Sequence, residues 1–162
     1  MKERGQVSHG RARFEEVKHS SLLEKPIVLR GMLYYDAPSR VEKRTESPFE
    51  ERYVVDQGTV LIERHKKRPR IFSLQDHPMI RAFVEGFRAT LAGDLETLQM
   101  LYDTHFSGER QRWRLVLVPL HDDMSSIVES IHIEGSDTDI TQIEIREVGG
   151  DSSRISIREN LL

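Results

Sequence analysis

Cysteine is absent from the 162 residues of this chain. Its absence excludes a disulfide, a thiolate metal site and a cysteine nucleophile, although it does not select a cellular compartment. Runs of about 18 apolar residues, which a membrane-spanning helix needs, are also missing. The net charge of −3 lacks the basic excess of nucleic-acid-binding domains, so we expect no nucleic-acid partner. The length and the 37% hydrophobic content are typical of one globular domain.

Motifs for catalysis or cofactor binding are also scarce. The chain has neither a glycine-rich phosphate-binding loop nor a G-x-S-x-G nucleophile motif. None of the seven histidines forms a helical metal-ligand pair, and residues 121–123 (His-Asp-Asp) are more typical of a solvated turn than of a metal site. A triad assembled from distant residues stays an open alternative. We predict no catalytic residue, no metal site and no cofactor.

The N-terminal residues 1–10 are polar and lack the apolar centre of a signal peptide. We expect them to be flexible and residues 11–158 to form a single domain. Two alternatives fit this N-terminus, namely a cytoplasmic protein and a mature protein whose signal peptide has been removed.

Short apolar segments, separated by residues typical of turns, occur between Arg11 and Leu74 and again after Thr104. A spacing of about ten residues per strand predicts an antiparallel meander. The predicted strands include Ile27–Tyr35, Arg40–Ser47, Glu51–Val55, Thr59–Arg64, Ile71–Leu74, Arg112–Val118 and Ile127–Glu134, followed by two strands around Ile143–Ile145 and Ile155–Ile157.

Between these two groups of strands the apolar period changes to that of a helix. One stripe at i, i+3, i+4, i+7 and i+11 consists of Ile80, Phe83, Val84, Phe87 and Leu91. We predict Asp76 as its N-cap, Pro78 in its first turn and a break at Gly93. Asp94 then caps a second helix, whose stripe is Leu95, Leu98, Leu101 and Tyr102. Periodicity alone favours core packing for the first stripe over a lid above an apolar cavity.

A basic run, Arg64–Arg70, separates two predicted strands. We interpret it as a solvated hairpin tip. The alternative is a contact for an acidic partner or for anionic lipid head groups.

Several short motifs, in order and spacing, are similar to those of a known family. They are residues 12–16 (ARFEE), 31–43 (GMLYYDAPSRVEK), 55–60 (VDQGTV), 113–119 (WRLVLVP) and 143–145 (IEI). On these motifs the chain resembles the outer-membrane lipoprotein carrier (LolA-like) superfamily over about residues 11–158. Within it, the resemblance is to the divergent LolA-related proteins.

The resemblance implies an α+β fold, a half-open antiparallel β-barrel made of a strongly curved sheet, with the helical hairpin inserted as a lid. It implies a soluble, non-enzymatic periplasmic carrier that is made with a cleaved signal peptide. Such a carrier binds acyl chains of a lipoprotein or another lipid in an apolar cavity and shuttles them toward the outer membrane. The implied partners are an inner-membrane exporter and an outer-membrane acceptor, and the protein is expected to be a monomer.

The ligand-binding residues implied by the resemblance lie in the sheet and in the lid. Those of the lid are the helical stripe Ile80, Phe83, Val84, Phe87 and Leu91. Those of the sheet are Phe14, Leu33, Tyr35, Val41, Leu61, Phe72, Trp113, Leu115 and Leu117. Which face of each strand is concave stays open, because a shift of one residue inverts the face.

One departure from the family narrows this prediction. The housekeeping carrier has an arginine before the proline that ends its second strand, and that arginine takes part in lid opening. Here the position is Ala37, and Arg40 does not match it. The resemblance therefore does not imply that this protein transfers a lipoprotein from the exporter to the acceptor. Two alternatives are a non-enzymatic sensing or protein-interaction module of the same fold, and an enzyme that uses the same cavity.

Overall fold

A computed structural model describes residues 9–37 and 39–160, in which antiparallel strands form one 11-stranded sheet. Residues 1–8, expected to be flexible, and Pro38, in the predicted turn after the second strand, lie outside the described residues. The strands follow the order β6-β5-β4-β3-β2-β1-β11-β10-β9-β8-β7. Their bounds are β1 (His9–His19), β2 (Ile27–Asp36), β3 (Arg40–Ser47), β4 (Glu51–Asp56), β5 (Thr59–Arg64), β6 (Arg70–Ser73), β7 (Tyr102–Glu109), β8 (Arg112–Pro119), β9 (Val128–Ser136), β10 (Asp139–Glu147) and β11 (Ser152–Asn160).

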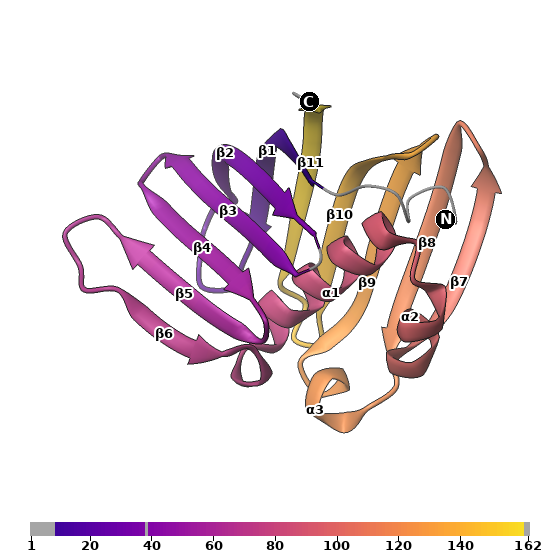
Figure 1. Ribbon diagram of the computed structural model, residues 1–162. Coiled ribbons are helices and arrows are strands. Elements are labelled where there is room, and N and C mark those ends of the chain that lie inside the picture. Colours follow the sequence, from indigo (N-terminus) through magenta and orange to yellow (C-terminus); the bar gives the residue numbers. More distant parts are fainter. Residues whose placement is uncertain (1–8, 38, 161–162) are drawn as a thin grey trace.

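The sheet curves around helix α1 (Pro78–Ala92) and does not close, as Figure 1 shows. Strands β1 and β11 pair in the middle of the sheet, whereas β6 and β7 are its edges. The chain passes from one edge to the other through η2 (Leu74–Asp76), α1 and α2 (Leu95–Leu101), and α3 (Asp122–Ser125) follows β8. The predicted half-open barrel with a helical hairpin inserted near its middle is confirmed.

The two faces of the sheet differ in polarity, because alternate residues of a strand point to opposite sides. The concave face carries the hydrophobic core, with Leu33 and Ile133 among its buried residues. Each such side chain contributes on the order of 1.5–3 kcal/mol when fully buried. The convex face is charged. There Glu42 pairs with Arg44 at 2.7 Å and with Arg52 at 3.1 Å.

The helical hairpin begins and ends much as its sequence predicts. Pro78 occupies the first turn of α1, where its missing N–H costs no hydrogen bond. Gly93 ends α1 at φ 67°, a left-handed conformation that suits glycine. Asp94 caps α2, since its side chain accepts a hydrogen bond from the backbone N–H of Thr97 at 3.2 Å. None of the helices within the described ranges is long and apolar enough to cross a membrane.

Three boundaries differ from the predicted ones. Asp76 does not cap α1, because it belongs to the one-turn helix η2, and His77 occupies the cap position without a side-chain hydrogen bond. Tyr102, expected in the second helix, begins β7, an edge strand whose mostly exposed polar residues give no strand pattern. Strand β1 begins at His9, before the expected start of the domain at residue 11.

Replacing Gly31 with alanine should destabilise the fold strongly. A Cβ atom at this position would lie 1.9 Å from the carbonyl oxygen of Arg44 and 2.9 Å from Cα of Thr45. Both are backbone atoms of the paired strand β3, so relief requires the strands to separate. We expect the free energy of unfolding to fall by at least about 2 kcal/mol, as for overpacked cores. Denaturant titration of the wild type and the variant measures this change.

Gly149→Ala is the matched control, because a Cβ atom there meets nothing within 4 Å. Its effect should stay within about 0.5 kcal/mol of zero. Equal stabilities of the two variants would contradict the close approach of β3 to Gly31.

Candidate functional site

Helix α1 covers the concave face of the sheet unevenly. It packs closely on β9 and β10, whereas its N-terminal half stands away from β1, β3 and β4. The space between them is a cavity of about 300 Å³. That is twice the roughly 150 Å³ of an apolar cavity that binds benzene, and it equals the lower limit of ligand pockets, about 300–1,000 Å³. The cavity can therefore take part of an apolar chain without any movement of α1.

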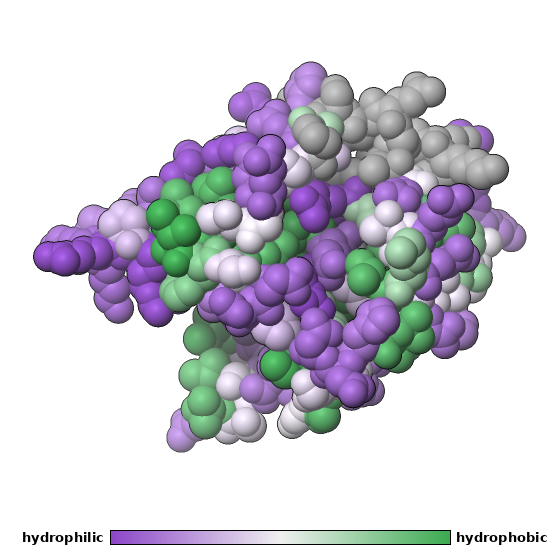
Figure 2. Space-filling view, turned by 60° about the horizontal axis from the view of Figure 1, so that its bottom comes forward, coloured by the Kyte–Doolittle hydropathy of each residue, from purple (hydrophilic) through white to green (hydrophobic). Residues whose placement is uncertain are grey.

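Most of the cavity wall is apolar. Helix α1 contributes Met79, Ile80, Phe83 and Val84, and the sheet contributes Val41, Tyr53, Val55, Ile145 and Ile155. The cavity reaches the surface, because Lys18, one of its lining residues, is exposed. In Figure 2, hydrophobic side chains (green) gather between hydrophilic borders on the left, the side on which β3–β6 lie.

Most of the predicted ligand-binding residues fall into two groups. Those that line the cavity are Val41, Ile80, Phe83 and Val84. Those that lie buried in the hydrophobic core without lining it are Phe14, Leu33, Tyr35, Phe87, Trp113, Leu115 and Leu117. Phe87 packs against the rings of Phe83 at 5.7 Å and of Tyr35 at 6.1 Å between centroids. These contacts anchor α1 to the sheet.

Three predicted residues lie elsewhere. Leu61 pairs with Val54 on the convex face, and its neighbours Val60 and Ile62 face the core instead. The expectation that Leu61 faces the concave side is therefore wrong, by the one-residue shift that inverts a strand. Phe72 is half-buried and lies edge-on to the ring of His77, with 4.6 Å between centroids. Leu91 belongs to α1, but its side chain is outside the described part of the structure.

Sequence reasoning missed a polar cluster on the cavity floor, made of Glu16, Lys43 and Ser153. The ammonium group of Lys43 pairs with Oε1 of Glu16, and the hydroxyl group of Ser153 donates to Oε2. Glu16 is 2% exposed. Residues two apart in a strand share a face, so Glu16 lies on the face of Phe14 and Lys43 on the face of Val41. A charged residue at such a position, next to a buried apolar one, was the sequence feature that could have predicted this cluster.

The carboxyl group of Glu16 stays ionised in this environment. Burial raises its pKa, but the ammonium groups of Lys43 and Lys18 and the hydrogen bonds lower it by more, so the net pKa lies below the ordinary value. Lys43 also lies over the ring of Phe14, with Nζ 5.4 Å from the ring centroid. The floor of the cavity is thus charged at one place and apolar around it.

A second polar cluster fixes α1 on the side away from the cavity. Nη1 of Arg81 donates to Oε1 of Gln75 at 2.8 Å and to Oδ2 of Asp123 at 2.9 Å. The hydroxyl group of Tyr102 donates to Oε1 of Glu85 at 2.9 Å. Burial raises the pKa of both Tyr102 and Glu85. These bonds join α1 to η2, α3 and β7, whereas its contacts across the cavity are apolar.

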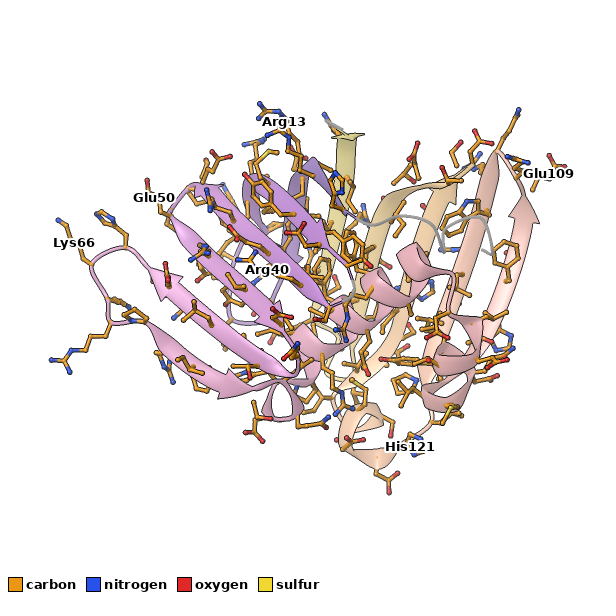
Figure 3. All side chains as sticks on the ribbon, viewed as in Figure 1. Arg13, Arg40, Glu50, Lys66, Glu109 and His121 are labelled. Atoms are coloured by element: carbon orange, nitrogen blue, oxygen red, sulfur yellow. The ribbon has the colours of Figure 1, made fainter. Side chains whose placement is uncertain are left out.

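The remaining motifs from the sequence lie outside the cavity. The basic run Arg64–Arg70 is confirmed as a hairpin tip between β5 and β6, and Figure 3 shows Lys66 pointing away from α1 at its end. Near residues 121–123, Asp123 pairs with Arg81, and His121 lies beside the carbonyl oxygen of Met100. Among the described residues, no three His, Asp or Glu side chains are grouped so as to hold a metal ion.

An unclosed, curved antiparallel sheet with a helix above an apolar cavity defines the class of half-open β-barrel proteins. A family model described as "Outer membrane lipoprotein carrier protein LolA-like" matches residues 2–158. The chain therefore belongs to the LolA-like family. The resemblance predicted from the short motifs is confirmed. A comparison with curated protein sequences found no significant match.

Solved structures agree on the fold. A LolA superfamily protein from Nitrosomonas europaea is similar with a TM-score of 0.53 at 7% identity, over 98% of this chain and 90% of that one. A domain provisionally named an outer membrane lipoprotein-sorting protein, from Vibrio parahaemolyticus, gives 0.53 at 8% identity, over 98% and 87%. A chain of the MucA/MucB complex of Pseudomonas aeruginosa gives 0.50 at 12% identity, and this chain covers 53% of its length.

Replacing Glu16 with glutamine should weaken the acid dependence of stability. The pKa of Glu16 is lowered from 4.5 in the folded protein, so its ionised form stabilises the fold above that value. This contribution disappears as the pH falls through the folded-state pKa. Between about pH 5 and about pH 3, the free energy of unfolding should therefore fall more steeply for the wild type than for the variant. Denaturant titrations across this range give both slopes.

The control is Glu24→Gln, which changes an exposed carboxylate in the β1–β2 loop, outside the cavity. Its slope should match that of the wild type. If Glu16→Gln also keeps the wild-type slope, the ionised pair does not stabilise the fold.

Proposed function

We propose that this protein is a non-enzymatic carrier that binds acyl chains of a lipoprotein or another lipid in the cavity under α1. The observation that carries the proposal is the apolar space between Ile80, Phe83 and Val84 of α1 and the concave face of the sheet. The carrier would work in the periplasm, moving its cargo toward the outer membrane. Membership of the LolA-like family supports both statements.

The physical need for such a carrier follows from the cost of exposing hydrocarbon to water. Each CH₂ group costs about 0.8 kcal/mol, so a chain of about 16 carbons does not cross an aqueous compartment alone at useful concentrations. A protein cavity supplies the dry surface. It also has to release the chain at its destination, which favours partial enclosure over a sealed interior.

A long acyl chain needs more room than about 300 Å³, so α1 has to move outward from the sheet. The polar contacts of Arg81 and Glu85 lie on the opposite side of the helix from the cavity. Outward movement on the cavity side separates apolar side chains that the incoming chain replaces. The lid therefore opens at a modest cost in free energy when a ligand is present.

The partners that fit this role are a membrane exporter that loads the carrier and an outer-membrane acceptor that unloads it. Position 37 is alanine, in place of the arginine expected from the housekeeping carrier. Opening of the lid in this protein therefore depends on other residues. We propose that the carrier acts as a monomer.

A protein-interaction module of the same fold is the second candidate. The exposed edge of β6 favours it, since an unpaired strand can accept a strand from a partner. A similar chain, of which this protein covers 53%, comes from the MucA/MucB complex and so belongs to a protein that has a protein partner. A purified protein that binds no lipid, but retains a protein partner, would favour this candidate over the carrier.

Filling the cavity should weaken lipid binding without unfolding the protein. Ile80 is partly buried and lines the cavity, so Ile80→Trp adds volume to the wall from the helix side. Loss of space for two CH₂ groups, at about 0.8 kcal/mol each, corresponds to about tenfold weaker binding. Displacement of a fluorescent fatty acid measures the dissociation constant, and native mass spectrometry detects lipid that copurifies.

Met100→Trp is the matched control, because Met100 is 74% exposed on α2 and does not line the cavity. Its dissociation constant should equal that of the wild type. Unchanged lipid binding by a folded Ile80→Trp variant would place the lipid outside this cavity.

A further inference from the structure

The cavity floor departs from apolar packing at one place. The buried polar residues on the concave face of the described sheet are Glu16, Thr45 and Ser153. Glu16 and Ser153 line the cavity together with Lys43, and the apolar residues Val41, Val55 and Ile155 surround them. A charged cluster therefore sits at the base of a cavity that is otherwise suited to hydrocarbon.

Although ionised Glu16 stabilises the fold, stability alone does not explain why this place holds an ion pair and not apolar side chains. A buried ion pair has to recover the cost of removing two charges from water, and an apolar pair of similar volume is often equally stable or more stable. Here the neighbouring strands already supply apolar side chains that fill the same layer. The placement of Glu16 and Lys43 points to a binding role instead.

The free hydrogen-bond donors of the cluster are on its cationic side. The ammonium group of Lys43 has three N–H donors, and Glu16 is the acceptor of its hydrogen bond within the described residues. Lys18, on the same face of β1, adds a second ammonium group at the exposed end of the cavity. Glu16 already accepts from both Lys43 and Ser153. Among the residues that line the cavity, two ammonium groups stand against one carboxylate, so the lining itself has an excess of positive charge, and Glu147, outside the lining, also interacts with Lys18.

We infer that the cavity selects an amphiphile with an anionic head group, a carboxylate or a phosphate. The head group binds between Lys43 and Lys18, and the hydrocarbon chain runs under α1 along Ile80 and Val84. A charge-assisted hydrogen bond from Lys43 holds the anionic oxygen. This inference rests on the proposed carrier function and specifies the chemical class of its ligand.

The test compares three ligands that share one hydrocarbon chain, namely laurate, dodecyl phosphate and dodecanol. Each displaces a fluorescent probe from the wild-type protein. We expect laurate and dodecyl phosphate to bind about tenfold more tightly than dodecanol, the value for one charge-assisted contact. Acetate and inorganic phosphate, which lack the chain, should not displace the probe at the same concentrations.

The decisive variant is Glu16→Gln combined with Lys43→Met. Removing Lys43 alone would leave Glu16 buried and unpaired, with a risk of unfolding, whereas the double variant removes both charges. Its preference for laurate over dodecanol should fall from about tenfold to about the threefold that Lys18 still contributes, and it should bind dodecanol as the wild type does. Circular dichroism confirms the fold.

A milder variant, Lys18→Gln, changes an exposed side chain and tests the same point if the double variant does not fold. It should weaken laurate binding by about threefold and leave dodecanol binding unchanged. Lys25→Gln, in the β1–β2 loop outside the cavity, is the matched control and should change neither.

Equal affinity of the wild type for laurate and dodecanol would overturn the inference and leave the carrier function in place. A folded double variant that keeps the full tenfold preference for laurate would also overturn it, by locating the head group elsewhere. Failure of all three ligands to bind the wild type would instead refute the proposed function, and the inference with it.

Discussion

Strands β6 and β7 follow each other in the order of strands along the chain but lie at opposite edges of the sheet. The connection between them has to cross the whole concave face, and α1 makes this crossing with 15 residues (Figure 1). A helix in that position buries one apolar side against the sheet. The sheet curves around this helix, the hydrophobic core lies between the helix and the sheet, and the two edge strands β6 and β7 stay unpaired with each other.

The uneven fit between α1 and the sheet produces the candidate site. On one side the helix packs on β9 and β10 and is joined to α3 by Arg81 and Asp123. On the other side it faces β1, β3 and β4 across the cavity. A helix that is anchored on one side gives up few contacts when the other side opens, so the same element serves as core and as lid.

Membership of the LolA-like family and the apolar cavity are the two observations on which the proposed carrier function rests. The ion pair between Glu16 and Lys43 adds a charged place to the cavity, which the fold alone does not predict. Ions in an apolar wall cost free energy unless they are paired, and Ser153 and Phe14 complete the environment of this pair. The fold thus supplies an apolar cavity, and the proposed choice of a polar head group depends on these individual side chains.

The sequence by itself determined the strands other than β7, the helical hairpin and its caps at Gly93 and Asp94, because these depend on local periodicity and backbone conformation. It also identified α1 as the helix with the apolar stripe. Only the tertiary structure decided which stripe residues meet the cavity, since Phe83 lines it and Phe87 does not. Strand faces and the meeting of Glu16 with Ser153, 137 residues apart, depend on register and long-range pairing, which local patterns do not encode.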